Sequence, residues 1–182
     1  MRLVTTGAAM KVALGPNGFG PSHGRIAIYC APKAVLQHVQ WSISEVLARP
    51  VTLRWQPQPL AASCFQTELN WEGLIGTASK LVSTLMGWHY LTFELHETGG
   101  NGNDGSIYMF TPELGIFRGA IGPHGDLMVN ENQIRRVLNE NLRPADALDG
   151  IESLLGSKWD EALEPYRKIS AGESDLDARL SV

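Results

Sequence analysis

The order of strand-like and helix-like patterns between residues 25 and 97 is the feature that most limits the fold. Apolar residues are nearly continuous in 25–31, follow helical spacing in 33–48, alternate in 51–56 and 64–72, return to helical spacing in 77–87 and alternate again in 90–97. This β-α-β-β-α-β order is that of the split βαβ, or ferredoxin-like, arrangement, whose antiparallel sheet carries both helices on one face. We therefore predict an α+β fold with a ferredoxin-like core.

Later segments extend this core with added strands and C-terminal helices. Further strands are predicted at 106–111, 115–121 and 126–129, and further helices at 131–141 and within 144–168. Asn130 and Gln133 have the spacing of a capping box at the start of the helix 131–141. Thr77 is the expected N-cap of the helix 77–87. The domain organisation is predicted as a flexible tail over 1–23, a single α+β domain over 24–168 and a C-terminal tail over 169–182.

A set of apolar residues is expected to form the core. Its members are Ile26, Ile28, Val39, Ile43, Leu53, Leu69, Leu81, Leu85, Phe93 and Ile107. A second apolar set runs at helical spacing through Ile151, Leu154, Leu155, Trp159, Ala162, Leu163 and Tyr166. Such a stripe has to cover something apolar, either the sheet or a partner subunit. A homodimer through this C-terminal helical region is therefore one expected partner arrangement.

Composition excludes several classes of protein. Of 182 residues, 43% are hydrophobic and 19% charged, which is typical of a globular chain. The formal net charge of −4 and the lack of any Lys/Arg cluster argue against nucleic-acid binding. No apolar run approaches the ~20 residues of a membrane span, and the N-terminus lacks a signal-peptide pattern, so we expect a cytoplasmic protein. Cys30 and Cys64 are too few for a zinc site and are expected to be reduced thiols. No metal or cofactor is expected.

Two glycine-containing segments are better explained by structure than by ligand binding. Residues 100–105 match GxGxxG, but a strand follows where a dinucleotide fingerprint needs a helix, so we expect a loop. Gly76 and Thr77 open a helix whose amides could hold an anion, although plain capping is the favoured interpretation. His89 and His96 are expected to be surface or boundary histidines on opposite sides of one strand.

Four polar side chains gather between residues 113 and 126, and they are the candidate catalytic residues. They are Glu113, Arg118, His124 and Asp126. If Asp126 accepts a hydrogen bond from one imidazole nitrogen of His124, the other nitrogen becomes a positioned base. The plainer alternative is a turn in which His124 is solvated. Because successive turns of a meander lie at opposite ends of a sheet, Glu113 can join His124 only if the strand between them bends, with Gly119 and Gly122 as the candidate positions. Trp88 and His89 are weaker binding candidates, expected near the His124–Asp126 pair.

Several short segments resemble those of a known family. They are Cys30–Pro32, His38–Trp41, Leu69–Gly73, Gly76–Ser79, Gly87–His89, Thr111–Phe117 and His124–Asp126. Across residues 24–165 the chain resembles a small uncharacterised actinobacterial family, a domain of unknown function. The resemblance implies a bacterial cytosolic protein with no established activity, cofactor or catalytic residue, often encoded near fatty-acid synthesis genes. Residues 1–23 have no counterpart in that family, which favours a translation start nearer Met10 or later.

Two functions follow as hypotheses. The first is a non-catalytic binding or regulatory module for a small molecule or a protein, linked to fatty-acid metabolism, because no complete nucleophile, metal or phosphate motif occurs in the sequence. The alternative is an enzyme that acts on an acyl or other anionic small molecule with His124 and Asp126. A pocket that holds several of the candidate side chains would favour the enzyme.

Overall fold

The computed structural model describes residues 20–100, 103–141 and 143–180. Its strands are β1 (Pro21–Pro32), β2 (Gln56–Pro57), β3 (Cys64–Leu74), β4 (Thr92–Glu97), β5 (Gly105–Thr111), β6 (Gly115–Ile121) and β7 (Leu127–Met128). Its helices are η1 (Lys33–Val35), α1 (Leu36–Val46), α2 (Thr77–Leu85), α3 (Glu131–Glu140), α4 (Pro144–Leu155) and α5 (Ser157–Leu180). The strands form one sheet in the order β2-β3-β1-β4-β5-β6-β7, and every pairing is antiparallel. The predicted α+β class with an antiparallel sheet is confirmed.

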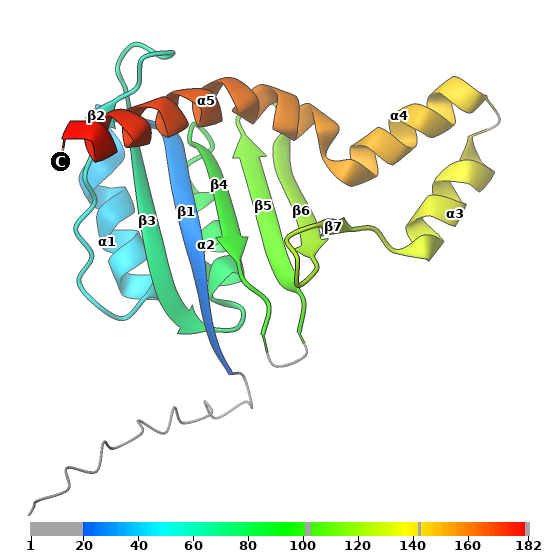
Figure 1. Cartoon of the computed structure of the whole chain (residues 1–182), viewed down its shortest axis with the longest axis horizontal. Coiled ribbons are helices and arrows are strands. Elements are labelled where there is room, and N and C mark those ends of the chain that lie inside the picture. The colour runs from blue at the N-terminus through cyan, green and yellow to red at the C-terminus, as the bar shows by residue number, and fades with distance from the viewer. Residues whose placement is uncertain (1–19, 101–102, 142, 181–182) are drawn as a thin grey trace, which may run out of the picture.

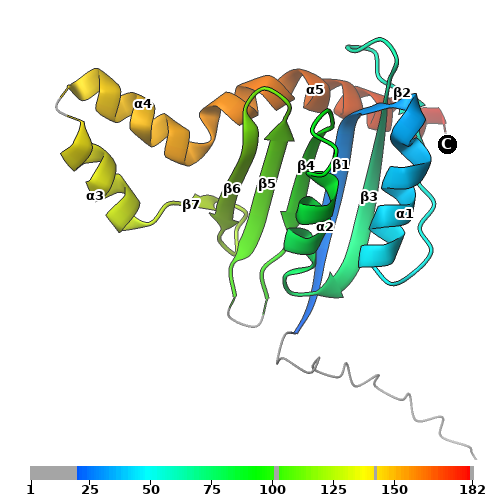
Figure 2. The ribbon, with the colours of Figure 1, turned by 180° about the vertical axis from the view of Figure 1, so that it is seen from behind.

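The sheet carries helices on both sides. Helices α1 and α2 cover one side of β3, β1 and β4, whereas α5 crosses the other side near one end of the strands (Figures 1 and 2). Between the sheet and α1/α2 lies the main core, which includes Ile26, Ile43, Trp71 and Phe93. Eight of the ten predicted core residues are buried, but Leu69 and Ile107 are only half-buried. Leu69 packs against the main core, and Ile107 packs against a second cluster that includes Tyr29 and Leu163.

The C-terminal stripe was predicted as one surface, and the structure divides it between two helices. Gly156 ends α4 in the left-handed conformation (φ 74°), and a methyl group there would lie 2.8 Å from Cζ of Phe117. Beyond this break, Leu163 of α5 is fully buried, with Trp159 and Tyr166 packed around the same cluster. The part of the stripe on α5 therefore covers the sheet, which was one of its two expected partners.

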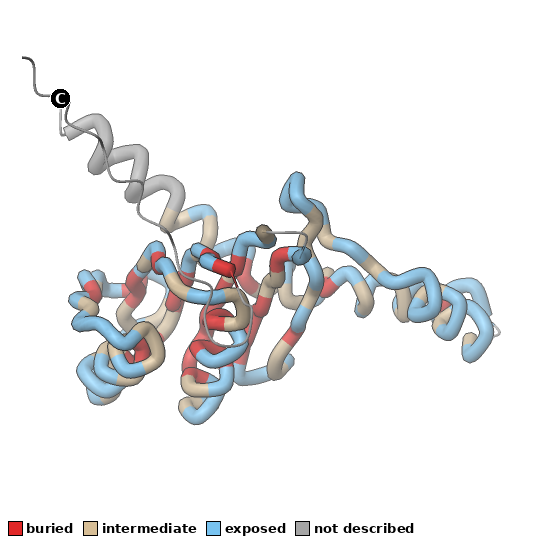
Figure 3. Tube along the Cα trace, turned by 90° about the horizontal axis from the view of Figure 1, so that it is seen from below, coloured by how far each residue is buried: buried red, intermediate tan, exposed pale blue. Residues whose placement is uncertain are grey.

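Helices α3 and α4 form an arm that projects from the sheet (Figure 1). The arm is largely exposed (Figure 3), with no buried residue in α3 and only Ala147 buried in α4. The predicted capping box at Asn130 and Gln133 is confirmed at the start of α3. Leu138 and Leu148 are 53% and 57% exposed, so the arm presents apolar side chains that its own domain does not cover.

Three boundaries differ from prediction. The strand expected at 51–56 is reduced to β2, because the N–H groups of Val51 and Leu53 donate to side chains of α1, at 3.1 Å to Ser44 Oγ and 2.9 Å to Gln40 Oε1, instead of to a neighbouring strand. Strand β1 begins at Pro21, inside the expected tail 1–23, of which residues 1–19 lie outside the described part. Helix α5 continues to Leu180, so most of the expected C-terminal tail, 169–182, is helical rather than irregular.

The expectation of two reduced thiols is wrong: Cys30 and Cys64 form a disulfide. Their strands β1 and β3 are neighbours in the sheet, and the register shifts beside Cys30. This brings the two Cα atoms to 5.1 Å, within the range that a disulfide spans. The cysteines are 34 positions apart in the sequence, and no local pattern indicated this proximity.

Candidate functional site

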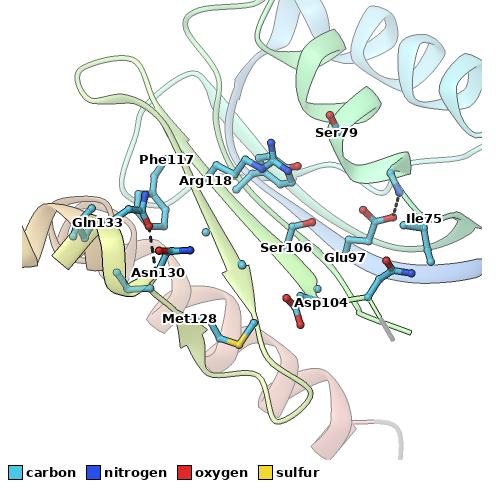
Figure 4. A pocket seen from close by; sticks show the side chains of 18 of the residues that line it. Ile75, Ser79, Glu97, Asp104, Ser106, Phe117, Arg118, Met128, Asn130 and Gln133 are labelled. Carbon is cyan, nitrogen blue, oxygen red and sulfur yellow. Dashed lines mark hydrogen bonds between the residues drawn. The ribbon is translucent and has the colours of Figure 1, made fainter. Parts of the chain in front are cut away.

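A groove of about 750 Å³ lies on the α1/α2 side of the sheet, over the strands that α2 leaves uncovered. Strands β5 and β6 form its floor, the start of α2 forms one wall, and the segment leading into α3 forms the other (Figure 4). Residues that alternate along the two strands, Ser106, Tyr108 and Arg118 among them, line it together with Glu97 of β4. The groove is as large as pockets that hold small molecules.

Arg118 lies at the centre of the groove floor (Figure 4). It is the register partner of Tyr108, and its guanidinium carbon lies 5.6 Å from the centre of the Tyr108 ring. This contact fits a cation–π interaction, which orients the guanidinium without neutralising it. Among the described residues, the Arg118 side chain makes no ion pair. The groove therefore offers a positive charge that no carboxylate of the described chain satisfies.

A buried carboxylate of β4, that of Glu97, lies against the wall at the start of α2. Gly76, with φ 91°, is the N-cap of α2, so the expected cap at Thr77 is wrong; the Thr77 hydroxyl donates instead to the carbonyl of Leu74 at 2.7 Å. Glu97 accepts the N–H of Gly76 at 2.9 Å and takes the place that an anion could occupy. Burial raises the pKa of Glu97 above its ordinary value, although the amide donors at the start of the helix oppose this.

The predicted His124–Asp126 pair does not meet in the structure. Both side chains are exposed on the turn between β6 and β7, where Gly125 has φ 89° and the N–H of Gly122 donates to the Asp126 carbonyl at 2.9 Å. In the part of the chain that the structure describes, neither side chain makes a hydrogen bond or ion pair. The arrangement has the features of a solvated turn.

The other candidates lie apart from His124. Strand β6 pairs with β5 in a regular register through Gly119, so it has no bulge there, and Gly122 follows the strand. Glu113 lies exposed at the opposite end of the strand from His124. Trp88 packs against the main core and His89 contacts Tyr90, both just before β4, at the sheet end away from His124. The expectation that Trp88 and His89 lie near His124 is therefore wrong. Of the four candidate catalytic residues, only Arg118 lines the groove.

A carboxylate–imidazole pair does exist, on the opposite side of the sheet. Glu94 and His96 are two residues apart on β4, and His96 Nε2 lies 2.6 Å from Glu94 Oε1. The other oxygen of Glu94 accepts from Tyr29 Oη at 3.0 Å and from Arg167 Nε of α5 at 2.8 Å. Sequence reasoning missed this pair, although the i, i+2 spacing on a strand was a usable signal because it places both side chains on one face.

The charge of Glu94 follows from these contacts. Burial alone would raise its pKa, but the hydrogen bonds and charges of His96 and Arg167 outweigh this and lower the pKa to about 2. Burial raises the pKa of the Tyr29 hydroxyl, helped by the neighbouring Glu94 charge. Glu94 is therefore ionised at neutral pH and can only accept hydrogen bonds.

Three further observations concern metal ions, the glycine-rich segment and the membrane. Nowhere in the described ranges do three or more His, Cys, Asp or Glu side chains form a group that could hold a metal ion. The GxGxxG segment joins β4 to β5, with its residues 101–102 outside the described part, and no helix follows it. Within the part of the chain that the structure covers, no helix has the length and apolar character needed to cross a membrane.

These observations define an α+β protein with an antiparallel sheet and an open groove that contains an unpaired arginine. The chain belongs to a family described as protein of unknown function, DUF3145, whose model matches residues 26–176. No curated protein matches the chain, and no solved structure does.

Proposed function

We propose that this protein is a non-catalytic module that binds a small anionic molecule in the groove over β5 and β6. The observation that carries the proposal is the unpaired guanidinium of Arg118 on the groove floor. Around it, the hydroxyls of Ser79 and Ser106 and the amide of Gln133 can bind polar parts of a ligand. Guanidinium groups bind carboxylates and phosphates through paired hydrogen bonds.

The walls of the groove favour a ligand that also has an apolar part. Ile75, Met128 and Leu154 line the groove beside the polar residues. An acylated molecule with an acidic group matches both kinds of surface. For this reason we propose a link to fatty-acid metabolism. The ligand class is then an acyl-chain carboxylate or a related acidic acyl compound.

Acyl-chain carboxylates of increasing length are expected to raise the melting temperature of the full chain. A ligand at 100 times its Kd stabilises the native state by about 2.7 kcal/mol. For a domain of this size that corresponds to a rise of roughly 5–10 °C. Replacing Arg118 with glutamine should remove most of the rise, whereas Arg54→Gln, an exposed arginine outside the groove, should leave it unchanged.

The same assay separates the binding module from the enzyme alternative. His124→Ala and Asp126→Ala should bind the carboxylates as the wild type does, because both residues lie on the turn and not in the groove. Loss of binding in these two variants, with Arg118→Gln unaffected, would favour an enzyme that uses His124 and Asp126. No rise with any carboxylate would refute the acyl ligand.

A protein partner is a second candidate, favoured by the arm of α3 and α4. We propose a homodimer through this C-terminal helical region, supported by the exposure of Leu148 and Leu155 on α4. Light scattering coupled to gel filtration should then report a dimer, and Leu148→Glu should shift it to a monomer. A wild-type monomer at every concentration tested would contradict the dimer.

Two further parts of the proposal concern fold and location. A ferredoxin-like core over β1, α1, β2, β3, α2 and β4 is supported by the strand order β2-β3-β1-β4 with antiparallel pairing. Actinobacterial origin and a cytoplasmic location rest on the resemblance to the family. The Cys30–Cys64 disulfide argues against a cytoplasmic location, because thiols are kept reduced there. Labelling of free thiols in fresh cell extracts tests the location: two labelled cysteines would support the cytoplasm, and none would argue against it.

A further inference from the structure

A small pocket of about 80 Å³ lies between the sheet and the break that separates α4 from α5. Two polar side chains line it, His96 of β4 and Asp160 of α5. The rest of the lining is mostly apolar and comes from β5, β6 and the end of α4, with Ile107, Met109, Phe117, Ile121 and Leu155 as its main members. The pocket therefore has an apolar interior with two polar groups beside it.

The strand residues of the pocket all point to the side of the sheet that α5 crosses. His96 is the register partner of Ile107, and Met109 is the register partner of Phe117. Register partners on neighbouring strands point to the same face. Met109 and Phe117 pack against Leu163 of α5, which identifies that face. The pocket is thus on the opposite side of the sheet from the groove that contains Arg118.

The imidazole of His96 is held in a fixed orientation at this pocket. Its Nε2 is 2.6 Å from Oε1 of the ionised Glu94 carboxylate, so the proton of the neutral ring lies on Nε2. Nδ1 is then an acceptor, and it has no hydrogen-bond partner among the described residues. The His96 side chain is 38% exposed, so a ligand can reach this atom.

The hydrogen-bond donors around Glu94 are already engaged. Tyr29 Oη and Arg167 Nε both donate to Glu94, at 3.0 and 2.8 Å. Arg167 Nη1 donates to Asp160 Oδ1 at 2.9 Å, and Arg167 Nη2 lies 3.3 Å from the sulfur of Met109. Oδ2 of Asp160 accepts no hydrogen bond from any described side chain, so the free polar atoms at the pocket are acceptors.

The charges of this network also favour a ligand that donates. The carboxylates of Glu94 and Asp160 both contact Arg167, so two negative charges share one positive charge. With a neutral imidazole on His96, one negative charge is in excess. A cation with several N–H groups would offset this charge and would satisfy both free acceptors.

We propose that this pocket binds the apolar end of a small primary amine, whose ammonium group donates to His96 Nδ1 and to Asp160. A water molecule in the liquid occupies about 30 Å³, so the pocket holds roughly two or three non-hydrogen atoms. The alkyl part that fits is therefore a chain of about three carbons. The ammonium group stays beside the pocket, where both side chains are partly exposed.

The test titrates the full chain, with labelled histidine rings, with alkylammonium ions from methylammonium to pentylammonium and follows the imidazole signals by NMR. At about pH 8 an alkylamine is still protonated, whereas an ordinary imidazole is neutral. We expect the His96 signals to shift and the affinity to rise about fourfold per methylene, up to about propylammonium. Longer chains should bind no more tightly, because their further carbons remain outside the pocket.

Two substitutions test the proposed contacts with the ammonium group. His96→Gln keeps an amide that can donate to Glu94 but removes the acceptor at Nδ1, and Asp160→Asn removes the negative charge. Each should weaken the binding of propylammonium roughly tenfold. The control variants His38→Gln and Asp149→Asn, at exposed positions outside the pocket, should leave the Kd unchanged. Circular dichroism of each variant confirms that it is folded before titration.

Uncharged and anionic probes of the same size test the choice of an amine. 1-Propanol and propionate should each bind at least tenfold more weakly than propylammonium, because neither carries a positive charge. Equal or tighter binding of either probe would overturn the inference. So would unchanged His96 signals with every alkylammonium ion, or wild-type affinity in both His96→Gln and Asp160→Asn.

The result is independent of the acyl-binding groove. Arg118→Gln should bind propylammonium as the wild type does, since Arg118 lies on the other side of the sheet. Conversely, His96→Gln should bind acyl-chain carboxylates as the wild type does, because His96 does not line that groove. Failure of one proposal therefore leaves the other intact.

Discussion

Replacing Glu94 with glutamine is expected to lower the free energy of unfolding at pH 7 by about 3 kcal/mol. The contacts with His96 and Arg167 lower the pKa of Glu94 from its ordinary value of 4.5 to about 2, and each tenfold change in proton affinity is worth ~1.4 kcal/mol. Glutamine resembles the protonated carboxyl and cannot provide this difference. Urea denaturation of both proteins at pH 7 measures the loss.

The same substitution should remove much of the acid sensitivity of the fold. Because the pKa of Glu94 is lowered on folding, its contribution is fully present above about pH 5 and is lost as the pH falls toward 2. The wild type should therefore approach the stability of Glu94→Gln as the pH is lowered from 7 to 3. The raised pKa of Glu97 acts in the opposite sense, but it is present in both proteins and cancels in the comparison.

Glu68 on β3 offers a matched control for this experiment. It pairs with Arg25 on the same side of the sheet, but the two side chains are 43% and 47% exposed. Exposed pairs typically contribute less than ~1 kcal/mol. Glu68→Gln should therefore change stability little at either pH. Equal losses in Glu94→Gln and Glu68→Gln would show that burial of Glu94 does not determine its contribution.

Replacing Phe93 with alanine is expected to cost ~3–5 kcal/mol of stability. Phe93 is fully buried in β4, between the sheet and the helices α1 and α2, and its ring stacks on Phe110 at 5.2 Å. Alanine would leave a cavity between the sheet and the helices, and these two layers cannot move together freely to fill it. Chemical denaturation followed by tryptophan fluorescence gives the magnitude.

Tyr90 is the aromatic control, because it is 36% exposed and lies just before the same strand. Tyr90→Ala should stay within ~0.5–1 kcal/mol of the wild type. A loss for Phe93→Ala as small as that for Tyr90→Ala would show that the main core does not depend on this ring. Such a result would also place the packing of α1 and α2 on the sheet in doubt.

The strands that were predicted well are those whose side chains point alternately to the two sides of the sheet. On each strand, either both sides are apolar cores or one side is a core and the other is solvent. Strands β3, β5 and β6 have this pattern and lie within one or two residues of their predicted bounds. The segment 51–55 also alternates but is not a strand, because α1 supplies partners for its N–H groups. Local alternation reports which side of a segment is buried, and it does not report which groups accept its backbone hydrogen bonds.

The candidate site was predicted only in part, because proximity in sequence was taken as proximity in space. Arg118 does line a groove, but His124 and Asp126 are on a solvated turn and Glu113 is a strand length away. The Glu94–His96 pair was readable from i, i+2 spacing. Its anchors were not, because Tyr29 and Arg167 come from β1 and α5, 65 and 73 residues from Glu94.

The sequence by itself determined the class of fold, the order of the elements and most of the core, since periodicity and turn residues act over a few neighbouring positions. Only the tertiary structure decided the Cys30–Cys64 disulfide, the break at Gly156 that separates α4 from α5, and the two hollows on opposite sides of the sheet. Each of these depends on which strands become neighbours and how far a helix extends across them. Such contacts form between residues far apart in the chain, where no local pattern records them.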